Sequence, residues 1–198
     1  MTAPARRATV LKESRREDLV QAAFQQIAER GFEGLRTREV AAAAGVNIAT
    51  LHYYFPTKEA LIRGVIGHAM GRFRSTLTPH SSPHDQLARH LRAVRTLMRS
   101  QPEIGAVMGE LALRSARDPA LGRIMRETHD GWHRTLRGLL RRAVRDGSLA
   151  PELDSDDAAA LIITTLMSMA LPSISPTRSD QAQRELDRWL RRRNVSSK

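Results

Sequence analysis

The chain has 198 residues, 41% of them hydrophobic and 27% charged, which is the balance of a soluble globular protein and not of a disordered one. It contains no cysteine, which excludes disulfide scaffolds, thiolate metal sites, iron–sulfur clusters and cysteine nucleophiles. The formal net charge is +11, almost all from arginine, so the chain is a candidate for binding polyanions.

Helical spacing of apolar residues recurs along the whole chain, and long alternating runs are missing, so the sequence predicts an all-α fold. The first predicted helix begins at Ser14, because Ser14 and Glu17 have the spacing of a capping box. Gly31 supplies the left-handed residue that ends this helix.

Two short helices follow, over residues 37–44 and 48–55. Gly45 permits a sharp turn between them, and Asn47 can cap the second. Two short helices joined in this way have the geometry of a helix-turn-helix, which inserts its second helix into the major groove of double-stranded DNA.

The rest of the chain is predicted to be helical as well. After Pro56, a helix from residue 58 keeps one apolar face for about five turns, until a Pro/Ser-rich stretch at residues 78–83 marks an internal boundary. Five further helices are expected around residues 87–101, 104–112, 119–146, 158–171 and 186–193.

The second short helix carries an unusual combination of side chains. Leu51 and Phe55 are spaced to point inward as core anchors. Its remaining positions are dense in hydrogen-bond donors and aromatic edges: Thr50, His52, Tyr53 and Tyr54, with Lys58 just beyond. A purely structural helix would not normally expose two tyrosines and a histidine together, so this helix is the predicted DNA-reading element.

The residues that carry this pattern also resemble a known family. Residues 31–61 read GFEGLRTREVAAAAGVNIATLHYYFPTKEAL. This block, within a match over about residues 14–62, is similar to the DNA-binding domain of the tetracycline-repressor (TetR) family. The rest of the chain resembles that family only in being helical and of fitting length.

The resemblance implies a role for individual residues. Those it assigns to phosphate, base-edge or backbone contacts are Thr37, Arg38, Asn47, Thr50 and Lys58. Those it assigns to the groove are Ile48, Ala49, Tyr53 and Tyr54. The chain departs from the family at His52, where tyrosine is usual, and at Ala49, where glycine or proline is common. His52 can still donate to phosphate, but its contact becomes sensitive to pH.

Charge is distributed unevenly over this head. Residues 17–60 hold 4 basic and 6 acidic side chains, whereas residues 1–16 hold 5 basic and 1 acidic. We therefore expect much of the phosphate attraction to come from the N-terminal segment, through Arg6, Arg7, Lys12, Arg15 and Arg16. The alternative is a solvated tail without a role.

A ligand pocket is predicted among the central helices, with a plain filled core as the alternative. Its expected lining is Met98, Val107, Met108, Leu111, Met125, His129 and Trp132. His129 and His133 lie four apart and could share a metal, but no third ligand follows and Gly131 is a poor helix former. We therefore expect no metal, no cofactor and no enzymatic activity.

A homodimer is expected on physical grounds. A helix-turn-helix that reads a two-fold operator acts as a dimer. The stretch 158–171 is apolar nearly all round and too short to span a bilayer, so it needs more cover than one chain offers. Gly131 and Gly138 would permit close helix approach, and with the following helix they predict a four-helix dimer interface.

Taken together, these features predict a cytoplasmic, one-component transcriptional regulator without a membrane partner. A helix-turn-helix head over residues 1–60 binds a palindromic operator, and a helical body over residues 61–198 dimerises and binds a small-molecule effector. The expected mode is repression relieved by the ligand. The alternative is a helical small-molecule or metal-binding protein in which the helix-turn-helix is only scaffold.

Overall fold

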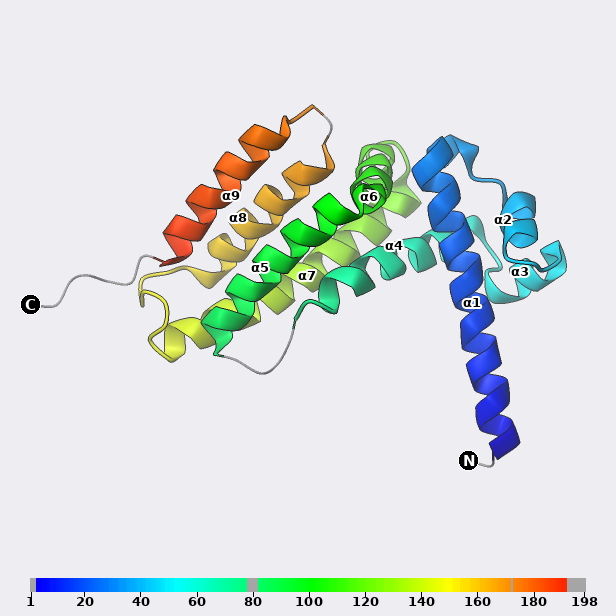
Figure 1. The fold of residues 1–198 in the computed structure, drawn as a ribbon, viewed down its shortest axis with the longest axis horizontal. Helices are drawn as coiled ribbons and strands as arrows, with labels where there is room; N and C mark the ends of the chain where they lie inside the picture. Colours follow the sequence, from blue (N-terminus) through cyan, green and yellow to red (C-terminus); the bar gives the residue numbers. More distant parts are fainter. Residues whose placement is uncertain (1–2, 78–81, 172, 192–198) are drawn as a thin grey trace, which may run out of the picture. The chain divides into compact units, whose positions relative to one another are not determined.

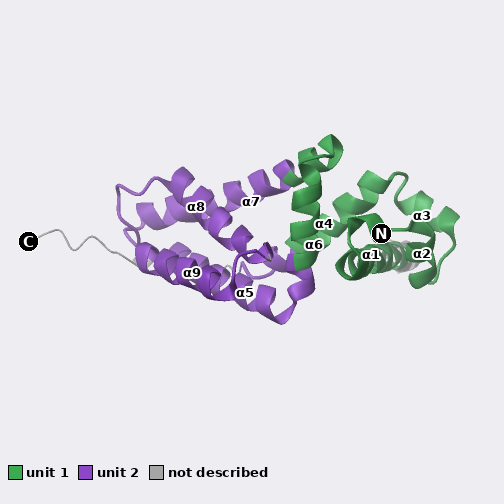
Figure 2. Ribbon diagram, turned by 90° about the horizontal axis from the view of Figure 1, so that it is seen from above, with its two compact units in different colours: residues 1–70, 106–125 green, residues 71–105, 126–198 purple. Residues whose placement is uncertain are grey.

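The computed structural model of the protein describes residues 3–77, 82–171 and 173–191 (Figure 1). Within these ranges every regular element is a helix, nine α-helices and two short 3-10 helices, which confirms the predicted all-α class. The chain forms two compact units (Figure 2). Unit 1 comprises residues 1–70 and 106–125, and unit 2 comprises residues 71–105 and 126–198.

Unit 1 begins with the long helix α1 (Ala3–Arg30), so the predicted start at Ser14 is wrong. Ser14 and Glu17 lie on the exposed surface in the middle of α1. Residues 5–13 are mostly good helix formers with no glycine or proline, and Pro4 occupies the first turn, where a helix tolerates proline. The spacing of a capping box marks a helix start only where the preceding residues cannot continue the helix.

The remaining elements of the head follow closely on α1. They are the 3-10 helix η1 (Phe32–Gly34), α2 (Thr37–Ala43), α3 (Ile48–Tyr54) and α4 (Lys58–Arg74). Gly31 has φ of 69° and Gly45 has φ of 66°, which confirms both as left-handed turn residues. The hydroxyl of Thr57 accepts from the Ala60 amide at 3.1 Å, so it caps α4 as expected.

The core of unit 1 depends on a close approach of α4 to α1 and α3. Leu19, Ala23 and Ile27 on α1 are buried, as is Leu61 on α4. A Cβ atom at Gly64 would lie 2.9 Å from Val20 Cγ2 and 3.1 Å from Phe55 Cε1. Glycine is therefore required at this point of α4, because a larger residue would push the helices of the head apart.

Two residues of α6 (Pro102–Ser115) hold the turn between α1 and α2. Gly31 precedes η1 and has no side chain to cap it. Glu110 caps it instead, because its Oε1 accepts from the backbone N–H of Phe32 at 3.1 Å. One turn further on, Arg114 forms an ion pair with Glu33. The entry to the helix-turn-helix is thus tied to a helix that lies far away in the sequence.

Unit 2 contains α5 (Pro83–Ser100), α8 (Ser155–Met167), η2 (Ser168–Ala170) and α9 (Pro176–Arg191). The unit boundary falls within α4, α6 and α7 (Pro119–Arg145). Asp154 caps α8, because its carboxylate accepts from the amides of Asp156 and Asp157 at 2.7 and 3.1 Å. Most of the predicted boundary at 78–83 lies outside the described residues, but α5 begins at Pro83 as the breaker pattern indicates.

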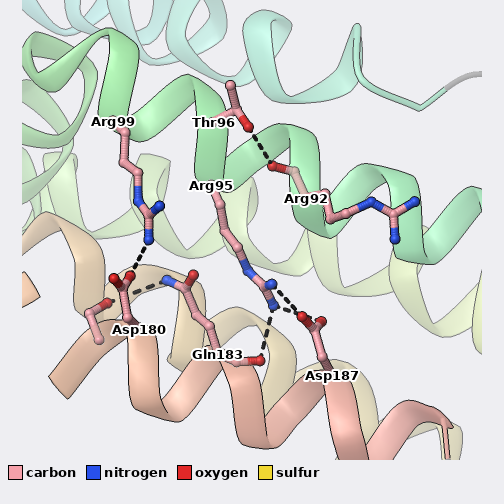
Figure 3. A network of polar contacts seen from close by, with 8 residues as sticks. Arg92, Arg95, Thr96, Arg99, Asp180, Gln183 and Asp187 are labelled. Carbon is pink, nitrogen blue, oxygen red and sulfur yellow. Dashed lines mark hydrogen bonds and ion pairs between the residues drawn. The ribbon is translucent and has the colours of Figure 1, made fainter. Parts of the chain in front are cut away.

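The last helix is fastened to α5 by arginine–aspartate pairs (Figure 3). Arg95 on α5 contacts both carboxylate oxygens of Asp187 on α9, at 2.6 and 2.9 Å, and also donates to the Gln183 carbonyl at 3.2 Å. Arg99 forms a second ion pair with Asp180. Arg95 is the more shielded of the two arginines, and its paired, planar contact fixes the position of α9 along α5.

A buried histidine of unit 2 links α5, α7 and the turn that follows α4. His90 is fully buried; its Nε2 accepts from Trp132 Nε1 at 3.2 Å, and its Nδ1 lies 2.6 Å from the hydroxyl of Thr76. Thr76 in turn donates to the carbonyl of Phe73, whose ring stacks on Trp132 at 5.6 Å. Because Nε2 accepts, the proton of a neutral His90 resides on Nδ1. Burial lowers the pKa of His90 to about 4.

The helix predicted to be apolar all round exposes one face. On α8, Leu161 is 48% exposed, and its neighbours Ala160 and Thr164 are exposed too, whereas Ile162 and Leu166 are buried. None of the helices in the described ranges is long and apolar enough to cross a membrane.

Candidate nucleic-acid interface

The turn between α2 and α3 is built from the residues that the sequence singled out. The amide of Val46 donates to the Ala41 carbonyl at 2.9 Å, which closes the turn around Gly45. Asn47 then caps α3, because its Oδ1 accepts from the Thr50 amide at 2.8 Å. The predicted cap is confirmed, and it sets the direction in which α3 leaves the turn.

The two faces of α3 divide as predicted. Leu51 and Phe55 are buried, and the Phe55 ring lies close to Gly64 of α4 and to Arg16 of α1. On the outer side His52 and Ala49 are exposed and Tyr53 is 68% exposed, the most exposed large hydrophobic side chain described. Tyr54 is half-buried and its ring meets that of Tyr53 edge-on, with centroids 5.2 Å apart. Ile48, at the start of the helix, is also half-buried.

The polar residues assigned to the DNA backbone differ in exposure and in whether their hydrogen-bond donors are already used within the protein. Arg38 is exposed and Thr37 half-buried at the start of α2. Thr50 donates its hydroxyl proton to Asn47 Oδ1 at 3.0 Å, so its hydroxyl offers only lone pairs outward and suits a phosphate poorly in this arrangement. The exposed amide NH2 of Asn47 is the better donor of the pair.

Lys58 lies at the first residue of α4 and is exposed. Its ammonium group stands over the ring of Phe32, 4.4 Å from the centroid. A cation–π contact of this kind holds the charge in place without neutralising it, so Lys58 keeps its charge for an anion.

Two cations of α1 lie beside the end of α3. Lys12 Nζ is 5.4 Å from the centroid of the Tyr53 ring, and the guanidinium carbon of Arg16 is 5.0 Å from that of Phe55. Lys12 and Arg16 are four residues apart and share one side of the helix. The sequence marked both as sources of phosphate attraction but placed Lys12 in a tail. The run of helix-forming residues over 5–13, without glycine or proline, is the signal that would have placed Lys12 on a helix. The side chains of Arg6 and Arg7 lie outside the described part of the chain.

Replacing Asn47 with alanine is expected to lower the free energy of unfolding by about 1 kcal/mol, because the Thr50 amide and hydroxyl lose their acceptor. Asn47→Ser keeps a capping oxygen and should retain most of that stability. Chemical denaturation of the two variants and the wild type measures the difference. Equal stabilities for the alanine and serine variants would show that the cap contributes nothing.

The residues predicted to line a ligand pocket are distributed over both units. In unit 1 the residues Val107, Met108, Leu111 and Met125 are buried. In unit 2 the residues Met98 and Trp132 are buried and His129 is half-buried. That these seven residues line a ligand pocket stays a prediction.

The histidine pair of α7 has separate surroundings. Burial lowers the pKa of His129, against an opposing effect of Asp130, and its buried Nε2 has no hydrogen-bond partner. His133 Nε2 instead lies 3.1 Å from the carbonyl of Asp156. Within residues 3–77, 82–171 and 173–191, no group of three or more histidine, aspartate and glutamate side chains is arranged to hold a metal ion.

Comparison with known proteins places both parts of the chain in the same protein family. Residues 19–65 match the family described as bacterial regulatory proteins, tetR family, and residues 77–188 match the tetracyclin repressor-like C-terminal domain. The chain is 27% identical over 148 residues to the HTH-type transcriptional repressor KstR2 of Mycolicibacterium smegmatis, which covers 72% of this chain and 71% of the relative. It is 24% identical over 152 residues to the fatty acid metabolism regulator protein of Bacillus subtilis, covering 75% and 77%.

A solved structure supports the fold. The structure of a TetR-family transcriptional regulator from Rhodococcus sp. superimposes with a TM-score of 0.77 at 23% identity and covers 90% of this chain and 99% of that one. The family match over residues 19–65 includes all of α2 and α3, and with them the polar outer face of α3. The chain therefore belongs to the TetR family of bacterial regulatory proteins and is a DNA-binding transcriptional repressor.

Proposed function

We propose that this repressor binds a palindromic operator as a homodimer and releases it when a small molecule binds to its body. The observation that carries the proposal is the outer face of α3, where Tyr53 and His52 are exposed while Leu51 and Phe55 fix the helix from behind. We assign the head to residues 1–60 and the body to residues 61–198. Because its target is chromosomal DNA, we place the protein in the cytoplasm.

The proposed DNA contacts are those that the outer surface of the head supports. Tyr53, Tyr54, Ile48 and Ala49 face the groove in this proposal. Phosphates are met by a further set of side chains: Thr37, Arg38, Asn47, His52 and Lys58. Thr50 is proposed to act near the DNA backbone by holding the side chain of Asn47. Asn47 is proposed to donate to a phosphate through its side-chain NH2 group, since its side-chain oxygen already accepts from the Thr50 hydroxyl.

The homodimer is proposed to form through α7 and α8. Leu161 is exposed on α8 in the single chain, and Gly131 and Gly138 lie seven residues apart on α7, where missing side chains favour close helix approach. Dimeric helix-turn-helix proteins bind half-sites about 34 Å apart, one turn of DNA. Sedimentation at micromolar concentration should give the mass of two chains. A monomer under these conditions would refute the proposed assembly.

The proposed effector is an apolar small molecule, because six of the seven predicted lining residues are hydrophobic. His129 would supply the polar contact, since its Nε2 is buried without a partner. The relative from B. subtilis is named a fatty acid metabolism regulator, which fits an apolar effector. A coupling free energy of about 1–3 kcal/mol between the ligand and DNA is the usual scale for such release. Regulators of this family are generally not enzymes.

Deleting residues 1–12 is expected to reduce the salt dependence of DNA binding. This deletion removes Arg6, Arg7 and Lys12, and the slope of log K against log salt should fall by about 0.9 for each phosphate that the protein no longer neutralises. Residues 10–18 are exposed, so the core of the head keeps its side chains. Fluorescence anisotropy at several salt concentrations measures the slope.

The control is a deletion of residues 192–198, which also removes three cations, Arg192, Arg193 and Lys198. It should leave the slope unchanged. The same slope for the wild type and the N-terminal deletion would mean that the cations at the start of α1 do not meet DNA.

A further inference from the structure

A small pocket in unit 1 shares no lining residue with the predicted effector pocket. Its volume is about 150 Å³. Buried apolar side chains from η1, α4 and α7 form its floor: Phe32, Ile62, Leu121 and Ile124. Polar side chains form its rim: Lys58, Glu59, Arg114 and Asp118. A cavity of this size holds a ring about as large as benzene.

The charges at the rim are not equally available. Asp118 is turned to its own helix, where its Oδ1 accepts from the amides of Ala120 and Leu121 at 3.0 and 3.1 Å. Arg114 is neutralised by Glu33, although its guanidinium carbon still lies 5.3 Å from the Phe32 ring centroid. Arg114 therefore has a carboxylate partner, and Lys58 is the rim cation for which the described residues provide none.

Lys58 stands closest to the apolar floor. Its Nζ is 4.4 Å from the centroid of the Phe32 ring, and no carboxylate pairs with it among the described residues. Glu59 is the next residue of α4, so its side chain leaves the helix roughly 100° away around the axis. The ammonium group is exposed at the mouth of the pocket, where it can pair with an anion while the apolar part of that anion enters the pocket.

We propose that this pocket binds a small organic anion, a carboxylate on a ring or short chain of benzene size. The carboxylate would pair with Lys58 at the rim, and the apolar part would lie on Ile62, Leu121 and Ile124. An anion held here would also withdraw Lys58 from the phosphate contact predicted for it. That consequence rests on the proposed function, whereas the binding itself is tested without DNA, so the two can fail separately.

The test uses the full-length protein and benzoate as the probe, followed by NMR of the backbone amides. Benzoate should shift the amides of Phe32, Leu121 and Ile124 in a saturable manner. Benzyl alcohol, which has the same ring without the charge, should bind roughly tenfold more weakly, and acetate, which has the charge without the ring, should bind more weakly still.

The chain offers a matched pair of lysine variants. Lys58→Met keeps the aliphatic stem and should weaken benzoate binding roughly tenfold or more, to the level of benzyl alcohol. Lys12→Met removes the same charge from α1 and should leave benzoate binding unchanged. Glu59→Gln should tighten binding severalfold, because it removes one of the two acidic groups of the rim.

Three results would overturn the proposal. One is benzoate that shifts no amide of the pocket, or only amides elsewhere in the protein. Another is equal affinity for benzoate and benzyl alcohol, which would leave the charge without a role. The third is equal affinity of the Lys58 and Lys12 variants. Both substitutions are at exposed positions, and thermal unfolding verifies that each variant is folded.

Discussion

Replacing Tyr53 with alanine is expected to weaken operator binding by about 2–6 kcal/mol without a measurable loss of stability. A side chain that reads the groove contributes about 1–3 kcal/mol, and in a homodimer the substitution acts at both half-sites. Tyr53 is 68% exposed, and its ring meets that of Tyr54 edge-on and lies beside the ammonium group of Lys12. Exposed substitutions of this kind usually change the free energy of unfolding by about 0.5 kcal/mol or less.

The measurement pairs operator affinity with thermal unfolding. Leu113→Ala is a suitable control, because Leu113 is 65% exposed on α6, outside the helix-turn-helix, and should affect neither quantity. Tyr53→Phe separates the ring from the hydroxyl. A Tyr53→Ala variant that unfolds at a lower temperature but keeps its operator affinity would favour the scaffold interpretation of the helix-turn-helix.

Acidification from pH 7 to pH 4 is expected to cost the protein about 3 kcal/mol of stability through His90 alone. Burial lowers the pKa of His90 from 6.5 to about 4, so between these values the unfolded chain binds more protons than the folded one. The contribution of His90 is complete above pH 6.5 and is lost as the pH falls toward 4. Protonation would also remove the acceptor that Nε2 offers to Trp132 Nε1.

His90→Gln isolates this effect. Glutamine can accept from Trp132 and donate to Thr76 but does not titrate, so its unfolding free energy should fall by about 3 kcal/mol less than that of the wild type over the same pH range. The comparison uses the change in unfolding free energy with pH for each protein, so a destabilisation by the substitution that is the same at every pH cancels. Parallel curves for the two proteins would show that His90 does not couple to pH.

Local signals made most of the fold predictable. The helix-turn-helix follows from a glycine that must adopt positive φ, an asparagine that caps, and two apolar residues four apart, all within residues 45–55. The caps at Thr57 and Asp154 follow in the same way. The failure at Ser14 is also local: the pattern of a cap was present, but residues 3–13 continue the helix through it.

Contacts between residues far apart in the sequence could not be predicted. Phe32 and Glu110 are 78 residues apart, and Arg95 and Asp187 are 92 apart. Each pair depends on the register of two packed helices, which no periodicity within one helix determines. The same holds for the candidate site: the outward face of α3 was predictable, but the position of Lys12 beside Tyr53 requires the packing of α1 on α3.

We propose that α3 reads a specific DNA sequence. Fragmented DNA from the source genome, incubated with the purified protein and sequenced after capture, tests it most directly, with Tyr53→Ala as the control. We expect a recovered palindrome with half-sites about one helical turn apart, lost in the variant. Retention without sequence preference, equal for both proteins, would contradict it, because charge alone would then explain the binding.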